Sequence, residues 1–317
     1  MMKRYILLRF MQLIPILFGI TFVSFLLMYA AGSDAVIQKY SLTGQSVSQA
    51  VIEAERRELG LDRPMLLQYA AWLHGVLQGD MGRSFVTGAD VFGTFLDKLP
   101  ATLLLTLLSV LLTLAISLPL GILAALRQDS RGDLFIRLLS FLGSSMPNFF
   151  VALLLMYFLA IQAGLLPVIS GGSTLSAAVL PTLTLAIAMS SRYTRQIRGL
   201  VLEELSQGYV AGARARGVPF RQVLARSIMR AALPTLLTLL ALSVGSLLGG
   251  TAIVESIFMW DGVGKMAVDA INTRDYPVIE AYVLWMGIIY VAVNLVTDIA
   301  CKFLDPRLGA PGTEGSR

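Results

Sequence analysis

The 317-residue chain has a single cysteine, Cys301, a single histidine, His74, and few charged residues, which make up 14% of it. One cysteine excludes a disulfide framework. Cys301 and His74 alone cannot form a soft-ligand metal site, which needs three or four converging side chains. Soluble domains are about one quarter charged. Because this chain is also 56% hydrophobic, with a mean hydropathy of +0.73, its composition predicts an integral membrane protein.

Uncharged apolar runs predict the membrane spans. A helix needs about 20 residues to cross the bilayer core, and a charge at its centre costs about 2.5–3.5 kcal/mol. The run 138–191 is too long for one crossing, and 162–176, with Pro167 and a glycine pair, divides it into two. The five runs are Phe10–Ser33, Leu99–Leu126, Leu138–Ser191, Thr235–Val254 and Ala281–Thr297. Because the third run counts as two, the chain is predicted to have six spans. An even number of spans places both termini on the same side.

Positive charge predicts which side is cytoplasmic. The N-terminus, 127–137, 192–230 and the C-terminal tail hold 3, 3, 8 and 3 of the Lys and Arg residues, together 17 of 25. Cytoplasmic loops carry such an excess. Both termini are therefore predicted to be cytoplasmic.

The same pattern divides the chain into four segments. Residues 1–33 form a retained anchor helix, because the apolar stretch is too long for a signal peptide and no A-x-A site follows it. Residues 34–98 form an extracytoplasmic loop or cap with helical spacing in its middle. Residues 99–308 form the core with the other five spans, and 309–317 form a flexible tail. The fold class is an all-α membrane protein.

The stretch 207–234, "QGYVAGARARGVPFRQVLARSIMRAALP", has five arginines and no acidic residue. Its arginines are not interleaved with aromatics on a polar face, so nucleic-acid binding is not predicted. A helix continuing out of the fourth span is expected to end at Gly217, and Pro219 is expected to begin a second helix. Pro234 then marks the start of the fifth span. The two helices form a knob suited to docking another protein, although contact with anionic lipid is the alternative.

This knob resembles the coupling loop of ABC importer permeases, whose pattern is E-A-A, three residues, G, and an I-x-L-P-like end. The chain has Ala211 in place of the glutamate. The peptide and nickel branch has Y-V-x-x-A-R-A-K-G, which residues 209–217 resemble. Further motifs in the same order cover nearly the whole chain. They are "LPATL" at 99–103, "SMPNFF" at 145–150, "GGTAIVESIF" at 249–258, "GVG" at 262–264, "RDYPVI" at 274–279 and "LDPR" at 304–307.

The resemblance implies a type I importer permease of the inner membrane. It also implies as partners a second homologous permease, two ABC ATPase subunits that use ATP and Mg²⁺, and an extracytoplasmic solute-binding protein. The chain lacks G-x-x-x-x-G-K-[ST], so it is not predicted to be an enzyme or to bind a cofactor or metal of its own. The implied ATPase-coupling residues are Tyr209, Ala211, Gly212, Ala213, Arg214, Ala215, Arg216, Gly217, Val218 and Pro219.

Five further residues are candidates for the translocation pathway: Ser145, Met146, Pro147, Asn148 and Glu255. The first four form either a kink that lines the pathway or a packing kink in which Asn148 bonds a freed carbonyl. Glu255 is expected to make a structural hydrogen bond. A position facing the outer mouth of the pathway is the less favoured alternative. Arg274 and Asp275 read as a local turn.

The expected substrate is nickel or a nickel chelate, placed ahead of di- and oligopeptides and metal-opine chelates. A secondary transporter is the alternative of a different class. It would need an ionisable residue at the centre of a span, and the runs above contain none.

Overall fold

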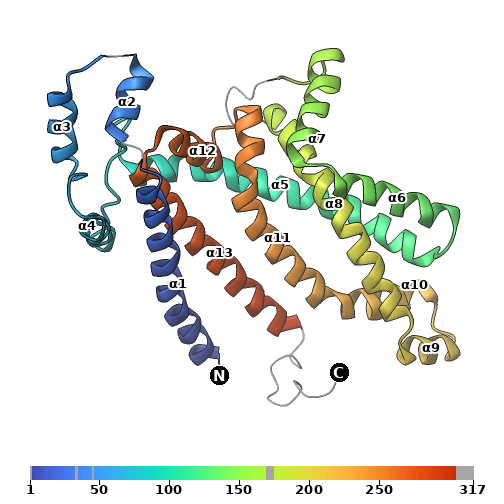
Figure 1. Cartoon of the computed structure of the whole chain (residues 1–317). Helices are drawn as coiled ribbons and strands as arrows, with labels where there is room; N and C mark the ends of the chain where they lie inside the picture. Colours follow the sequence, from blue (N-terminus) through green and yellow to red (C-terminus); the bar gives the residue numbers. More distant parts are fainter. Residues whose placement is uncertain (1, 33–34, 45, 169–174, 305–317) are drawn as a thin grey trace. The chain divides into compact units, whose positions relative to one another are not determined.

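A computed structural model describes residues 2–32, 35–44, 46–168 and 175–304 (Figure 1). These residues form helices and no strand, and an isolated antiparallel bridge joins Arg83 to Asp90. The predicted all-α fold is confirmed. Part of the predicted break 162–176 and the tail 309–317 lie outside the described residues.

Two compact units make up the chain. The first contains 1–103 and 248–292, and the second contains 104–247 and 293–317. Three helices therefore begin in one unit and end in the other: α5 (Val91–Leu126), α11 (Met229–Phe258) and α13 (Tyr276–Leu304).

Besides its parts of these three helices, the described residues of the first unit form five helices. They are α1 (Met2–Ala30), α2 (Ala35–Thr43), α3 (Gln49–Glu58), α4 (Met65–Leu77) and α12 (Val263–Thr273). Helix α5 begins at Val91, eight residues before the expected position 99, so the last part of the predicted cap belongs to a long helix. The helical spacing expected in the middle of the cap is confirmed by α3 and α4.

Aromatic packing holds the predicted cap against the first helix. Tyr69 of α4 is buried and packs edge-on against Phe18, Phe22 and Phe25 of α1. Its hydroxyl lies 2.9 Å from that of Thr21, so the polar end is hydrogen-bonded inside an apolar contact. Helix α4 of the predicted cap is therefore packed on α1 within the first unit.

The second unit contains the remaining helices. They are α6 (Arg131–Ser145), α7 (Asn148–Leu155), the π-helix η1 (Met156–Gln162), α8 (Leu175–Leu205), α9 (Gly208–Ala215), α10 (Phe220–Val223) and the π-helix η2 (Leu224–Ile228). Helices α5 and α8 meet at Gly121. A side chain there would place its Cβ 2.7 Å from Cγ2 of Ile197, so only glycine permits this approach.

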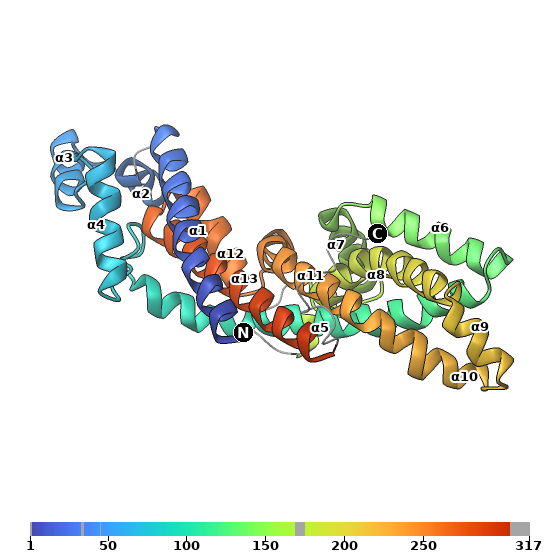
Figure 2. The same cartoon turned by 90° about the horizontal axis from the view of Figure 1, so that it is seen from below.

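Charged contacts fasten α6 to α8, which lie side by side (Figures 1 and 2). The Asp133 carboxylate is fully buried and accepts from Nε and Nη2 of Arg198 at 2.7 and 2.8 Å. Arg195, one turn earlier, donates to the carbonyl of Ser140 and the hydroxyl of Ser144. Paired nitrogen donors satisfy a buried carboxylate that would otherwise be costly to desolvate. The Asp133–Arg198 pair joins 127–137 to 192–230, two of the segments predicted to be cytoplasmic.

Four helices within the described residues are long and apolar enough to cross a membrane, or five if α6 with α7–η1 counts as one bent span. The four are Met11–Ala30, Val91–Leu126, Phe220–Gly245 and Tyr276–Cys301. The described uncharged part of α8, 175–191, is shorter than the about 20 residues that a span needs. The count of six spans, and the side on which the termini lie, stay predictions.

Replacing Asp133 by asparagine should destabilise the second unit by about 3 kcal/mol, because Arg198 would lose its buried charge partner. Thermal unfolding of the purified protein in lipid nanodiscs measures the change. Asp129→Asn is the matched control, since Asp129 is exposed two residues before α6 begins and has a left-handed backbone that asparagine tolerates. Equal melting temperatures for the two variants would contradict a stabilising role for the ion pair.

Candidate functional site

The predicted coupling segment begins at a break after α8. The hydroxyl of Ser206 donates to the carbonyl of Glu203 at 2.7 Å, and Gln207 has an extended backbone. Serine competes in this way with the helix's own hydrogen bonds. Helix α9 then starts at Gly208. The expectation of one continuous helix from the fourth span to Gly217 is therefore wrong.

Gly217 forms the corner between α9 and α10. Its backbone has φ +75°, its N–H donates to Arg214 O at 3.0 Å, and the N–H of Val218 donates to Ala213 O at 3.1 Å. These two bonds are the Schellman arrangement that ends a helix at a left-handed residue. Pro219 follows as the residue that caps α10. The predicted glycine corner and the helix start after Pro219 are confirmed.

One face of the knob packs onto the end of α8, where α9 and α10 lie in Figure 2. Val210 and Ala213 of α9 and Val223 of α10 are buried in one apolar cluster. The cluster also contains Tyr193, Ile197 and Val201 of α8, together with Ile228, Ala232 and Leu236. Burial of these side chains ties the knob to α8 through the hydrophobic effect.

The opposite face of the knob is exposed and basic. No ion pair involves any of its arginines within the described residues; they are Arg214, Arg216, Arg221, Arg226 and Arg230. Tyr209 donates to Glu204 Oε2 at 2.6 Å, and burial together with this carboxylate raises the pKa of Tyr209, so its hydroxyl stays a donor.

Exposure divides the ten predicted coupling residues into two sets. Ala213 is buried, while Gly212 and Val218 are half-buried. The other seven are exposed: Tyr209, Ala211, Arg214, Ala215, Arg216, Gly217 and Pro219. The knob therefore presents two small side chains and a glycine among unpaired arginines, a surface that another chain can approach closely.

The second helix of the knob runs on into the fifth span. Helix α10 passes through η2 into α11 without a turn, so Pro234 lies inside α11 and does not mark its start. The predicted boundary at Pro234 is wrong. The hydroxyl of Thr238 donates to the carbonyl of Pro234 at 3.0 Å, as hydroxyls in apolar helices commonly do.

The four pathway candidates around Pro147 lie at a sharp bend. Helices α6 and α7 meet at 102°, with Met146 extended as the residue before a proline must be. Ser145 donates to Phe141 O at 2.9 Å. Asn148 is exposed and has no hydrogen bond among the described residues. The alternative in which its side chain bonds a carbonyl freed by the kink is therefore wrong. Whether these residues line the pathway stays a prediction.

Glu255 is completely buried in the first unit and accepts hydrogen bonds from two neighbours. Thr102 Oγ1 donates to its Oε1 at 2.8 Å, and the N–H of Lys265 donates to its Oε2 at 2.9 Å. Thr102 also accepts from the N–H of Val263 at 2.9 Å. These are structural bonds, the alternative that the sequence favoured, and they place Glu255 inside the unit.

Three of the sequence motifs converge on this carboxylate: "LPATL" supplies Thr102, "GGTAIVESIF" supplies Glu255, and "GVG" supplies Gly262 and Gly264. A Cβ on Gly264 would lie 2.8 Å from the Cα of Ala252 and 2.8 Å from Glu255 Oε2. A Cβ on Gly262 would also clash with the Glu255 carboxylate. Glycine is required at both positions because the chain passes directly over Glu255.

Asp275 makes a long-range contact that the sequence did not reveal. Its carboxylate accepts from the hydroxyl of Ser84 and from the N–H of Phe85, the latter at 2.9 Å. Burial raises the pKa of the Asp275 carboxyl. The turn predicted at Arg274 is present, with φ +59°. Asp275 in this turn also anchors the loop before α5.

A row of buried hydroxyls on α5 was also not predicted from the sequence. Thr106, Ser109, Thr113 and Ser117 are buried, share one face of the helix, and have side-chain oxygens without a hydrogen-bond partner among the described residues. Their three- and four-residue spacing in an otherwise apolar span is the pattern that could have revealed them.

Comparison with known proteins gives the family. The family model described as binding-protein-dependent transport system inner membrane component matches residues 117–310, and its N-terminal companion matches 2–106. The chain belongs to this family. It is a multi-pass inner-membrane permease of an ABC importer in the peptide and nickel group, and separate subunits hydrolyse ATP.

Individual relatives agree over nearly the full length. The oligopeptide transport system permease protein AppB of Bacillus subtilis (strain 168) is 38% identical over 97% of this chain and 99% of its own. The nickel import system permease protein NikB of Staphylococcus aureus (strain bovine RF122 / ET3-1) is 33% identical over 97% and 94%. An inward-facing structure of the MetNI methionine ABC transporter has a TM-score of 0.55 at 16% identity, covering 67% of this chain and 96% of that chain. This last likeness shows the permease fold.

The substitution Gly264→Ala should destabilise the permease by about 1–3 kcal/mol, because its methyl group would overlap the backbone at Ala252. Gly199→Ala is the matched control. Gly199 lies inside α8, and a Cβ there meets nothing within 4 Å, so alanine should be neutral or slightly stabilising. Thermal unfolding of both variants in nanodiscs tests the close approach, and a Gly264→Ala protein as stable as the unmodified permease would argue against it.

Proposed function

We propose that the exposed face of α9 and α10 docks on an ATPase subunit and passes its movement to the membrane helices through α8. The single observation that carries this is the two-sided knob. One face is buried against α8, and the other presents small residues and arginines without acidic partners. A partner with an acidic groove would complement such a surface.

The attachment to α8 supports a lever. Val210, Ala213 and Val223 pack against α8, while Arg198 fastens the same end of α8 to α6. A displacement of the knob would therefore move α6 and α8 together. In free-energy terms, the docked ATPase biases a bundle with two arrangements. The assembly we propose has a second homologous permease, two ATPases and an extracytoplasmic binding protein, with 127–137 and 192–230 in the cytoplasm.

Gly217 gives the test of docking. Gly217→Arg places a long side chain on the exposed corner, where nothing of this chain lies within 4 Å. We expect ATPase co-purification and ATP-driven uptake to fall by about tenfold or more, the loss typical of a blocked central contact. Gly217→Asn should retain both activities, because asparagine tolerates the left-handed backbone and is smaller.

Gly164→Arg is the matched control. Gly164 also has a positive φ, +61°, and open space around its Cβ position, but it lies in the loop between η1 and α8. The Gly164→Arg variant should leave ATPase co-purification unchanged. If Gly217→Arg keeps the ATPase bound and uptake intact, the coupling assignment is wrong.

For the transported substrate we propose an oligopeptide. The sequence alone favoured nickel, but the oligopeptide relative is 38% identical against 33% for the nickel relative. Nickel or a nickel chelate is the second candidate, supported by the near-full-length similarity to the nickel permease.

Uptake into proteoliposomes separates the two candidates. The complete transporter with its binding protein should import a labelled tetrapeptide in an ATP-dependent manner, and excess unlabelled tetrapeptide should compete. Nickel chloride, alone or with a chelator, should neither compete nor accumulate. ATP-driven nickel accumulation without peptide uptake would reverse the assignment.

A further inference from the structure

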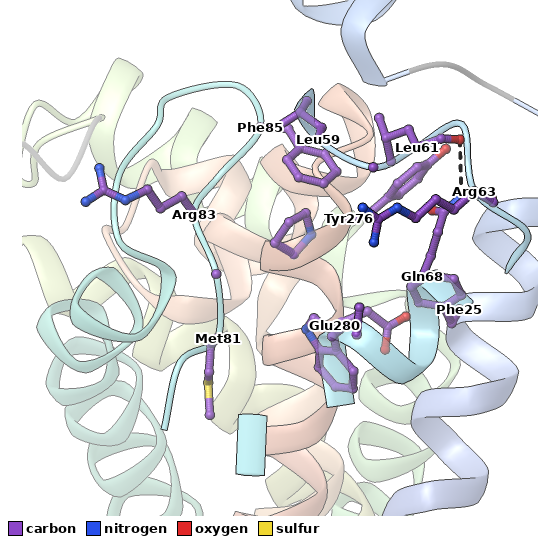
Figure 3. A pocket seen from close by; sticks show the side chains of 15 residues that line it. Phe25, Leu59, Leu61, Arg63, Gln68, Met81, Arg83, Phe85, Tyr276 and Glu280 are labelled. Carbon is purple, nitrogen blue, oxygen red and sulfur yellow. Dashed lines mark hydrogen bonds between the residues drawn. The ribbon is translucent and has the colours of Figure 1, made fainter. Parts of the chain in front are cut away.

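A pocket of about 240 Å³ in the first unit lies between the loop after α3, helix α4 and the start of α13 (Figure 3). This space is several times the about 30 Å³ that one water occupies in the liquid. Aromatic side chains form much of its wall, contributed by Phe25, Trp72, Phe85 and Tyr276. None of these residues belongs to the coupling knob or to the Glu255 cluster.

Two polar groups in the pocket have buried atoms that make no hydrogen bond of ordinary geometry among the described residues. Glu280 is 1% exposed, and neither of its carboxylate oxygens is in a hydrogen bond of ordinary geometry, although Ser24 lies near enough to interact. The indole Nε1–H of Trp72 is also buried and donates to nothing among the described residues. Buried polar groups without partners are costly, so both call for a ligand that supplies a donor and an acceptor.

A positive charge stands at the rim. Arg63 is exposed and has no ion pair within the described residues. In Figure 3 its guanidinium points into the pocket on the side facing Glu280. Gln68 fixes the loop that carries Arg63, because its Nε2 donates to Arg63 O at 2.7 Å and to Leu61 O at 3.2 Å.

We propose that this pocket binds a small zwitterionic ligand of the dipeptide class. The ligand's ammonium group pairs with Glu280, its peptide carbonyl accepts from Trp72 Nε1, and its carboxylate meets Arg63. The aromatic wall suits an ammonium group, which the face of an aromatic ring attracts. Because the site belongs to this chain alone, the inference holds whether or not peptides are the substrate that the transporter carries.

Calorimetry on the permease, in nanodiscs with its partner subunits and without the binding protein, tests the site. The probes are Ala-Ala, N-acetyl-Ala-Ala, which lacks the ammonium, and Ala-Ala amide, which lacks the carboxylate. Ala-Ala should bind, and both blocked forms should bind at least about tenfold more weakly, as expected when one partner of a charge pair is removed. Equal affinity for all three probes, or no binding of Ala-Ala to the unmodified permease, would overturn the proposal.

Three variants assign the contacts. Glu280→Gln keeps the shape and should weaken Ala-Ala binding at least about tenfold while leaving N-acetyl-Ala-Ala unaffected. Arg63→Ala, at an exposed position that cannot disturb the core, should remove the preference for Ala-Ala over its amide. Trp72→Phe should cost about fivefold for all three probes, the value of one hydrogen bond.

Glu58→Gln is the control, since Glu58 is exposed at the end of α3 and does not line the pocket. If Glu280→Gln and Arg63→Ala bind Ala-Ala as the unmodified permease does, the pocket is not the binding site. Because binding is measured without ATP or transport, a failed uptake assay leaves this result unaffected.

Discussion

The ion pair between Asp133 and Arg198 holds α8 against α6, on the same stretch of α8 that the knob packs against. Arg198 lies between Ile197, which packs against Gly121 of α5, and Val201, which packs against the knob. The same helical turns therefore contact α5 and α6 and carry α9. A fully buried carboxylate cannot easily give up paired donors, because an unpartnered charge in a low-dielectric site is costly. The lever proposed above needs this end of α8 to be held firmly, and the buried ion pair supplies one such attachment.

The first unit buries a carboxylate by different means. Glu255 forms no ion pair within the part of the chain that the structure describes. It accepts from a hydroxyl and from a backbone N–H, and the chain passes over it at Gly262 and Gly264. An arginine at such a point would need space that the close approach removes. The Glu255 side chain therefore joins "LPATL", 153 residues earlier in the chain at Thr102, to the neighbouring stretches 249–258 and 262–264.

The sequence predicted what depends on local pattern. The membrane class, the all-helical fold, the helices within the cap and the glycine corner at Gly217 follow from composition, periodicity and one residue that favours a left-handed backbone. The helix boundaries predicted from the sequence were wrong at two places, the end of α8 and the start of α11. Ser206 ends α8 eleven residues before the expected position, and Pro234 is accommodated within α11. The contacts of Asp133 with Arg198, of Glu255 with Thr102 and of Asp275 with Ser84 could not be predicted. The two residues of each pair lie 65 or more residues apart in the chain.

The hydroxyl row on α5 places four buried polar groups without hydrogen-bond partners among the described residues on one face of an apolar helix. An apolar span gains nothing from four buried hydroxyls at three- and four-residue spacing unless something satisfies them, since each unpaired hydroxyl costs roughly 1–3 kcal/mol. Serine and threonine in helices usually bond the carbonyl one turn back, as Thr184 does at 2.9 Å, and these four do not. A polar track along a membrane helix is therefore expected to hold water or to face a polar solute. In a permease, a polar row of this kind makes α5 a candidate for the pathway wall beside the bend at Pro147, because a polar solute could satisfy the hydroxyls that the described residues leave unpaired.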